Sequence, residues 1–376
     1  MIICFLLILK HHTNIQILKF KERNKYFYSH YINNCYKLKK YKINSIRKNI
    51  PFVSICLPVY NMEKYIESTI LSILNQSFQD FEVVIVNDNS NDKTSNILQK
   101  FILNNKITII NNSKNLGLYA SRVIGTLNSK GQFIILMDPD DMLLNPDILT
   151  ILYNYYLKYN LDIIEYKIYY YEEKTKKLYI NNNKFHYHFF NKPIIYQPEL
   201  SNVLFLSPLT KKYSSVICTV VWNKIIRRDV LMKTIYYLGE DYYKNYCITA
   251  DDTLVNVINL QFANNYTNIK YSGYMYNIRE TSMSHGKKNI KNQILFSYNY
   301  LMYNKKLYKY IKDFNKDRNF FFYELQRTNF RLIELKKLDK SKSSEINQFY
   351  KEIIEDKKIS SQFKEYLMKF LINLLL

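Results

Sequence analysis

From residue 52 onward, short apolar runs alternate with segments of helical periodicity, and this alternation restricts the possible folds more than any other feature. Each run is short and rich in β-branched residues, which predicts a buried strand. The four predicted strands are FVSICLPVY (52–60), FEVVIVND (81–88), ITIINN (107–112) and FIILMD (133–138). Predicted helices lie between them, within 61–77, from about residue 95, and over 118–129. This order predicts an α/β fold with a parallel, doubly wound central sheet flanked by helices.

Polar residues follow these strands at the point where each strand ends. The clusters are PVYN (58–61), NDNS (87–90) and DPDD (138–141). In open parallel sheets, ligands bind beyond the carboxyl ends of the strands. We therefore expect the three clusters to meet along one edge of the sheet and to form a binding site there.

The DPDD cluster places three carboxylates within four positions. Asp138 and Asp140 are two residues apart, and on an extended chain such side chains point the same way. A hard divalent cation such as Mn²⁺ or Mg²⁺ binds oxygen ligands and commonly bridges to substrate phosphates, so these two aspartates could share one. The alternative is a loop before a helix, with Asp141 or Asn145 as the helix cap. The spacing alone leaves both interpretations open.

A second pair of acids, Asp251 and Asp252, opens the predicted helix in ITADDTLVNVINLQFA (248–263). Acids at a helix N-terminus are favourable because of the helix dipole, so the pair has a structural interpretation beside a catalytic one. A further helix is predicted for ILTILYNYYLKY, and DIIEYKIYYY is predicted to be extended. Residues 172–215 are irregular and rich in tyrosine.

The net charge of +22 is concentrated in the two ends of the chain. Residues 1–50 and 286–376 each carry +10, whereas residues 51–285 carry only +2. A groove for nucleic acid would place its charge in the folded centre, so nucleic-acid binding is not expected. Basic ends fit a solvated tail or peripheral contact with an anionic membrane surface. The predicted division is a basic N-terminal segment that is poorly ordered, a central domain over 51–285, and a basic helical extension.

The five cysteines are widely spaced and form no CxxC pair, which indicates neither a disulfide framework nor a zinc site. Free thiols favour a reducing compartment, and we expect a cytoplasmic protein. The apolar ends MIICFLLIL and YLMKFLINLLL are shorter than the roughly 20 residues that a spanning helix needs. Either end could lie on a membrane surface.

Over about residues 52–285, the chain resembles the family 2 glycosyltransferases, which use nucleotide sugars and have the GT-A fold. The stretches that carry the resemblance most specifically are VSICLPVYNMEKYIESTILSILNQSFQDFEVVIVNDNSNDKT and NLGLYASRVIGTLNSKGQFIILMDPDD. VWNKIIRRDVL and ADDTLVN resemble segments that are common in members that build surface polysaccharides. These later matches are looser.

The resemblance implies a nucleotide site at the ends of the first two strands. Pro58, Val59 and Tyr60 would contact the base and ribose, and Glu63 would lie close to that pocket. Asp88 would accept a hydrogen bond from a uracil-type base.

This sequence departs from the family pattern at several of these positions. Asn87 stands where Asp is frequent, and Asn89 stands where Gly is frequent. The second change requires Asn to form a turn that Gly usually makes. Arg122 would lie near the diphosphate, although Val123 replaces the Asn that often follows it.

The resemblance also assigns the catalytic groups. Asp138 and Asp140 would bind Mn²⁺ or Mg²⁺, and His285 is a candidate third ligand with a surface loop as the alternative. Asp252 would be the base that takes the proton from the acceptor hydroxyl. Asp251 occupies a place more often held by Glu, so the choice between these two aspartates stays open.

The expected function is inverting, metal-dependent transfer of a sugar from a nucleoside diphosphate sugar, with UDP as the expected carrier. The acceptor would be a hydroxyl of a glycan or of a lipid-linked compound. One alternative is a sugar nucleotidyltransferase, although PVYNMEKY lacks the glycine-rich phosphate loop of those enzymes. Another is a catalytically degenerate homologue that acts as a binding or membrane-associated scaffold. The tryptophan, Trp222, could stack on an acceptor sugar or belong to the core.

Overall fold

The computed structural model describes residues 50–180, 194–197, 220–243, 251–279, 290–314 and 331–356, together with residues 200, 316, 325, 328 and 364. The chain divides into two units, Met1–Ile50 and Pro51–Leu376, and the described residues beyond Ile50 belong to the second. Residues 1–49 lie outside the described residues, so the prediction that the N-terminal segment is poorly ordered stays a prediction. The predicted three-part division of the chain stays a prediction.

The first half of the sheet consists of four parallel strands in the order β3-β2-β1-β4. Val59 lies beside Asn87, and Asn87 beside Asn111, so these strands end at the same edge. The α/β fold predicted from the sequence is confirmed, and this edge carries the predicted polar clusters. The bounds of the four strands are β1 Val53–Val59, β2 Phe81–Asn87, β3 Ile107–Asn111 and β4 Phe133–Leu136.

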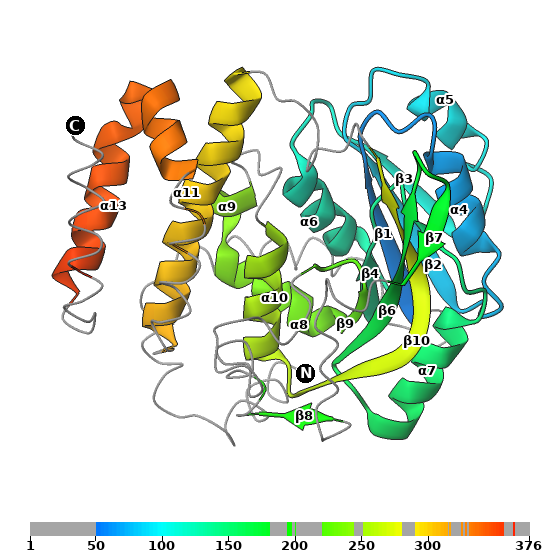
Figure 1. Ribbon diagram of the computed structural model, residues 1–376. Coiled ribbons are helices and arrows are strands. Elements are labelled where there is room, and N and C mark those ends of the chain that lie inside the picture. Colours follow the sequence, from blue (N-terminus) through cyan, green and yellow to red (C-terminus); the bar gives the residue numbers. More distant parts are fainter. Residues whose placement is uncertain are drawn as a thin grey trace, which may run out of the picture. The chain divides into compact units, whose positions relative to one another are not determined.

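Helices cover both faces of this half of the sheet (Figure 1). Successive strand residues point to opposite faces, so Ile55 and Leu57 belong to one core cluster and Cys56 to the other. The helices that contribute to the cluster of Ile55 are α4 Ile66–Leu74, α5 Thr94–Gln99 and α7 Ile148–Tyr159, and α6 Leu118–Asn128 contributes to the cluster of Cys56. Burial on both faces explains why the strands are continuous apolar runs rather than alternating ones.

The second half of the sheet is mixed and continues in the order β9-β6-β10-β5. Its short strand β9 is antiparallel to both β4 and β6, and β10 is parallel to β6. The extended segment predicted for DIIEYKIYYY is confirmed as β6, whereas β10, the longest described strand, was not predicted from the sequence. The strands are β5 Met142–Leu143, β6 Ile163–Glu172, β7 Lys177–Tyr179, β8 Ile195–Tyr196, β9 Lys224–Arg227 and β10 Asn265–Ile278.

A buried ion pair joins the two neighbouring strands β6 and β9. Lys224 Nζ lies 2.9 Å from Glu165 Oε2, and the two side chains are 1% and 2% exposed. The ammonium group also donates to the main-chain oxygen of Val220 at 2.7 Å and to Asn223 Oδ1 at 2.8 Å. These contacts compensate part of the cost of removing two charges from water.

The remaining described helices surround the core cluster that includes Cys56, and those that follow residue 286 confirm the expected helical character of that region. Leu307 and Ile311 of α11 belong to the same cluster as Val230 of α8 and Leu254 of α10. Within the described residues, none of the helices combines the length and apolarity that crossing a bilayer requires. The helices are α8 Arg228–Leu238, α9 Glu240–Tyr243, α10 Asp251–Phe262, α11 Ile290–Asp313 and α13 Ser343–Glu355, with a 3₁₀ turn, η2, at Lys340–Lys342.

Candidate active site

Asp88 directly follows β2, and its carboxylate holds the loop between β3 and α6. Its Oδ1 accepts from Asn112 Nδ2 at 2.7 Å and from the main-chain nitrogen of Leu116 at 2.8 Å. Its Oδ2 accepts from the main-chain nitrogen of Gly117 at 2.8 Å, and the residue is 3% exposed. Asp88 therefore has a structural role at the predicted edge, and its contact with a nucleotide base stays a prediction.

The other predicted nucleotide contacts lie at the end of β1. Pro58 and Val59 are part of the strand, and Tyr60 follows it with 39% of its surface exposed. Glu63 Oε2 accepts from the main-chain nitrogen of Lys93 at 2.9 Å, which ties the turn after β1 to the start of α5. These residues line the same edge as Asp88, and their binding role stays a prediction.

Asparagines form the tight turns that follow β1 and β2. Asn61 has φ 53° and Asn89 has φ 60°, both in the left-handed region that favours glycine. The expectation that Asn89 forms a turn usually made by Gly is confirmed. Asn61 Oδ1 accepts from the main-chain nitrogen of Asn91 at 2.8 Å and so joins the two turns.

Arg122 joins two of the predicted catalytic carboxylates. Its Nη2 donates to Asp138 Oδ1 at 2.8 Å, and its Nη1 donates to Asp252 Oδ1 at 2.6 Å. The guanidinium group comes from α6, Asp138 follows β4, and Asp252 lies in the first turn of α10. Arg122 is 3% exposed, whereas the two carboxylates are 22% and 28% exposed. The structure therefore brings these three residues together, although they come from distant parts of the sequence.

A second arginine, Arg279, pairs with Asp140. Arg279 directly follows β10, and its guanidinium carbon lies 4.8 Å from the centre of the Tyr65 ring. The hydroxyl of Tyr65 lies 3.2 Å from both carboxylate oxygens of Glu173. Burial raises the pKa of Asp140, and the charge of Arg279 opposes this rise.

Asp141 holds the turn that carries Asp138 and Asp140. It is fully buried, accepts from Tyr274 Oη at 2.5 Å through Oδ2, and accepts from the main-chain nitrogen of Asn277 at 2.8 Å through Oδ1. Both donors belong to β10. Burial raises the pKa of Asp141 well above its ordinary value, and the charges of Asp140 and Asp138 add to the effect. Asp141 therefore does not cap the following helix, α7, whose N-cap residue is Asp147.

The site contains an excess of negative charge around Asp138. Burial raises the pKa of Asp138 to about 6, Arg122 opposes the rise, and the carboxylates of Asp140 and Asp252 add to it. Carboxylates that repel one another in a buried place fit the donor chemistry of Mn²⁺ or Mg²⁺. Among the described residues, no group of three or more His, Cys, Asp or Glu side chains could hold a metal ion. The binding of a cation by Asp138 and Asp140 stays a prediction, and such a cation would take its remaining ligands from substrate phosphates and water.

The sequence also pointed to Asp251, His285 and Trp222 as candidate site residues. Asp251 is the first residue of α10, so the structure places it next to Asp252. His285 lies outside the described residues, and its role as a ligand stays a prediction. Trp222 is 4% exposed and stacks on Tyr274 and Tyr276 at ring distances of 4.7 and 5.1 Å, so it belongs to the core.

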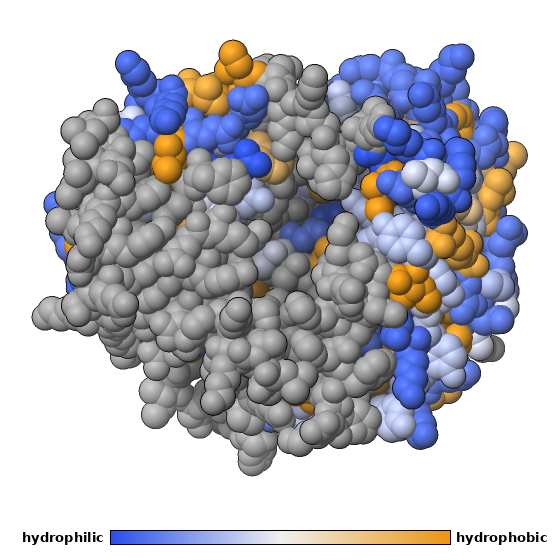
Figure 2. All heavy atoms as spheres, in the orientation of Figure 1, coloured by the Kyte–Doolittle hydropathy of each residue, from blue (hydrophilic) through white to orange (hydrophobic). Residues whose placement is uncertain are grey.

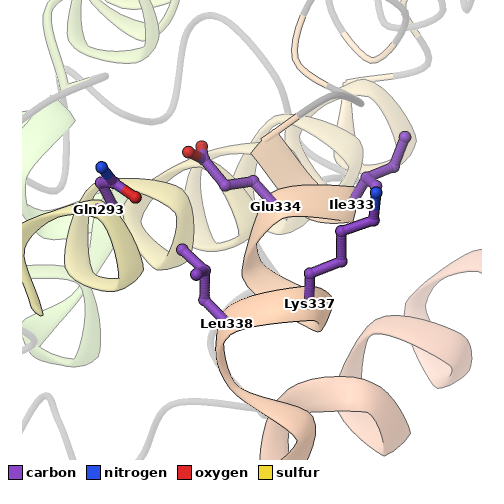
Figure 3. A pocket seen from close by; sticks show the side chains of 5 residues that line it. All are labelled: Gln293, Ile333, Glu334, Lys337 and Leu338. Carbon is purple, nitrogen blue, oxygen red and sulfur yellow. The ribbon is translucent and has the colours of Figure 1, made fainter. Parts of the chain in front are cut away.

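The surface of this part of the molecule is hollowed. Figure 2 shows a hollow over the region where α6 and β4 lie in Figure 1, with hydrophilic residues inside it. A separate pocket of about 330 Å³ lies between the C-terminal helices (Figure 3). It contains none of the predicted site residues, and its lining consists of Gln293, Ile333, Glu334, Lys337 and Leu338.

The sequence of the central part matches a known family. Residues 54–234 match the model of glycosyl transferase family 2. Residues 54–234 form a family 2 glycosyltransferase domain. This glycosyltransferase domain contains β1 to β4, the turn with Asp138 and Asp140, and Arg122.

Curated relatives match this chain over only part of their own length. An uncharacterized glycosyltransferase of Haemophilus influenzae is 39% identical over 98 residues, which are 26% of this chain and 39% of that protein. Glycosyltransferase GlyA of Streptococcus pneumoniae serotype 4 is 27% identical over 238 residues, which are 62% of this chain and 31% of GlyA. The chain therefore spans well under two thirds of the length of these two relatives.

A solved structure of S. aureus TarS 1-349 in complex with UDP-GlcNAc is also similar to the chain. It has 20% identity and a TM-score of 0.49, and the match covers 76% of this chain and 81% of TarS 1-349.

Three residues of the candidate site were not predicted from the sequence. Arg279, Tyr274 and Tyr65 contact the acidic turn or its partners, yet none of them lies in a polar cluster at the end of a predicted strand. Arg279 and Tyr274 belong to or follow β10, a strand that the sequence analysis did not predict. Tyr274 and Tyr276 alternate with Met275 and Asn277 in YSGYMYNIR, and this short period-two pattern is a signal that could have indicated the strand.

Proposed function

We propose that this chain is a metal-dependent, inverting glycosyltransferase that moves a sugar from a nucleoside diphosphate sugar to a hydroxyl group. The observation that carries the proposal is the contact of Arg122 with both Asp138 and Asp252. It brings a candidate cation ligand and a candidate base to the same edge of a family 2 glycosyltransferase domain.

In this proposal, Asp138 and Asp140 hold Mn²⁺ or Mg²⁺. The cation would neutralise the negative charge that gathers on the departing diphosphate. The raised pKa values of both aspartates, which follow from burial, support this role because the bound cation would relieve the repulsion between them.

Asp252 acts as the base for the acceptor. The acceptor oxygen forms a bond to the anomeric carbon, its proton passes to Asp252, and the bond from that carbon to the diphosphate oxygen breaks with its electron pair on the oxygen. Asp252 is 28% exposed, so an acceptor can reach it, and Arg122 holds its carboxylate in place. No covalent intermediate is required, because one displacement inverts the anomeric centre.

The nucleotide would bind at the ends of β1 and β2. Pro58, Val59, Tyr60, Glu63 and Asp88 would bind the nucleotide, with UDP as the carrier, because they lie at the ends of β1 and β2. The acceptor would be a hydroxyl of a glycan or of a lipid-linked compound. The basic ends of the chain would then allow peripheral contact with an anionic membrane in the cytoplasm.

Release of nucleoside diphosphate tests this function. The full chain is incubated with a panel of sugar nucleotides, with Mn²⁺ and with EDTA, and thermal stabilisation by each donor is measured in parallel. Release of UDP from one donor with Mn²⁺, lost with EDTA, supports the proposal. Formation of a sugar nucleotide from a sugar phosphate and UTP would instead identify a nucleotidyltransferase. Stabilisation by a donor without any turnover would identify a binding protein.

A further inference from the structure

A fully buried tyrosine of β10 lies behind the turn that carries the predicted cation ligands. Tyr274 is 0% exposed, and its ring stacks on Trp222 with 4.7 Å between the ring centres. Stacking and burial together fix where the hydroxyl group lies. Its position relative to the turn is therefore set by the sheet and not by the turn itself.

The hydroxyl of Tyr274 makes two hydrogen bonds to the turn. It donates to Asp141 Oδ2 at 2.5 Å and accepts from the main-chain nitrogen of Asp138 at 3.1 Å. One oxygen atom therefore contacts both the first and the last residue of DPDD, and Asp140 lies between them in the chain. Tyr274 Oη binds the main-chain nitrogen of Asp138, so the carboxylate of Asp138 can bind other groups, such as Arg122.

The turn is held from two further sides. The main-chain nitrogen of Asn277 donates to Asp141 Oδ1 at 2.8 Å. Thr69 Oγ1 in α4 lies 2.9 Å from the main-chain oxygen of Pro139 and 2.8 Å from that of Asp141. The hydroxyl of Tyr274 is the one of these groups that contacts Asp138, the residue that also binds Arg122.

We propose that Tyr274 is a positioning residue that sets the spacing of Asp138 and Asp140 for a divalent cation. This inference rests on the proposed function, because it concerns the cation that the two aspartates would hold. Residues that orient metal ligands without touching the metal typically change metal affinity by about 10-fold to 100-fold when they are replaced. We expect a loss of about 10-fold in Mn²⁺ affinity when the hydroxyl alone is removed.

The test compares Tyr274→Phe with a matched control, Tyr166→Phe. Tyr166 is also 0% exposed, and its hydroxyl donates to the main-chain oxygen of Trp222 at 3.1 Å, so the control loses a buried hydroxyl whose partner is Trp222 and not the turn. Mn²⁺ affinity is measured on the full chain without substrate, by titration calorimetry and by the EPR signal of free Mn²⁺. Hydrogen exchange of the Asp138 amide is measured in the metal-free protein.

The proposal expects Tyr274→Phe to weaken Mn²⁺ binding about 10-fold and to accelerate exchange at Asp138, while Tyr166→Phe changes neither. Turnover of Tyr274→Phe should recover at high Mn²⁺ concentration, which a general loss of folding would not allow. Equal Mn²⁺ affinity in the wild type and Tyr274→Phe would overturn the positioning role alone. A wild-type protein that binds no Mn²⁺ would overturn the metal-dependent function and this inference with it.

Discussion

Arg122 and Asp252 form an ion pair with 2.6 Å between Nη1 and Oδ1, although one belongs to α6 and the other to α10. The guanidinium group is planar and rigid, and its other terminal nitrogen binds Asp138. The relative positions of the candidate base and the candidate cation ligand are therefore set by one side chain. A flexible ammonium group would not set them in the same way.

Replacing Arg122 tests this arrangement. Arg122→Lys should keep the charge but lose the fixed geometry of the two contacts, because the shorter lysine side chain replaces a rigid planar fork by one ammonium group with rotatable donors. We expect turnover to fall about 100-fold and the free energy of unfolding to fall by about 3 kcal/mol, because a buried partner of two carboxylates is altered. Urea unfolding and UDP release measure the two effects. Wild-type turnover in this variant would exclude the positioning role of the guanidinium group.

Asp140→Asn removes one charge from the predicted cation ligands. We expect Mn²⁺-dependent turnover to fall by about 100-fold or more, because stabilisation of the departing diphosphate by a cation is worth several kcal/mol. The fold should be retained, as judged by an unchanged circular dichroism spectrum. Asp147→Asn is the matched control, since Asp147 is exposed at the start of α7. If Asp140→Asn kept wild-type turnover with Mn²⁺, Asp140 would not be a ligand.

Asp252→Asn separates binding from chemistry. The amide cannot accept the proton of the acceptor, so we expect turnover to fall about 100-fold to 10,000-fold while UDP still stabilises the protein against heat. Asp229→Asn serves as the control, because Asp229 is 60% exposed in the first turn of α8. Normal turnover of Asp252→Asn would move the base to another residue, and Asp251 would be the next one to test.

Lys224→Met tests the buried ion pair of β6 and β9 for a purely structural role. The change leaves the charge of Glu165 buried without its partner, so we expect a loss of about 3–5 kcal/mol in the free energy of unfolding. The double variant Lys224→Met with Glu165→Leu should recover most of this loss. Lys233→Met, in an exposed pair with Asp229, should change stability by less than about 1 kcal/mol. A similar small loss for Lys224→Met would show that the buried pair contributes little.

Most of the first half of the fold could be predicted from the sequence, because local signals determine it. The run FEVVIVND is buried on both faces in the structure, and a continuous apolar run is the signature of such a strand. The meeting of Asp138 with the strand ends also follows from local signals, since parallel strands end at the same edge. The family resemblance added Arg122 and Asp252, which periodicity could not have paired.

The second half of the sheet and the partners of the acidic turn depend on contacts between residues that are far apart in the sequence. Strand β10 contains Gly273, where a Cβ would overlap the side chain of Ile148, and its register with β6 shifts near Ser272. Glycine and polar residues weaken the pattern by which a strand is predicted. The partners of Asp141 and Asp140 lie in and just after this strand, so they could not be predicted without the sheet order.

The segment that matches the family ends at residue 234, before α10 and β10 begin. A truncated protein made to those limits would keep the acidic turn but lose Asp252, Tyr274 and Arg279. The family match and the contacts of the candidate site therefore end at different residues, and a shortened protein that keeps these contacts has to extend at least through Arg279.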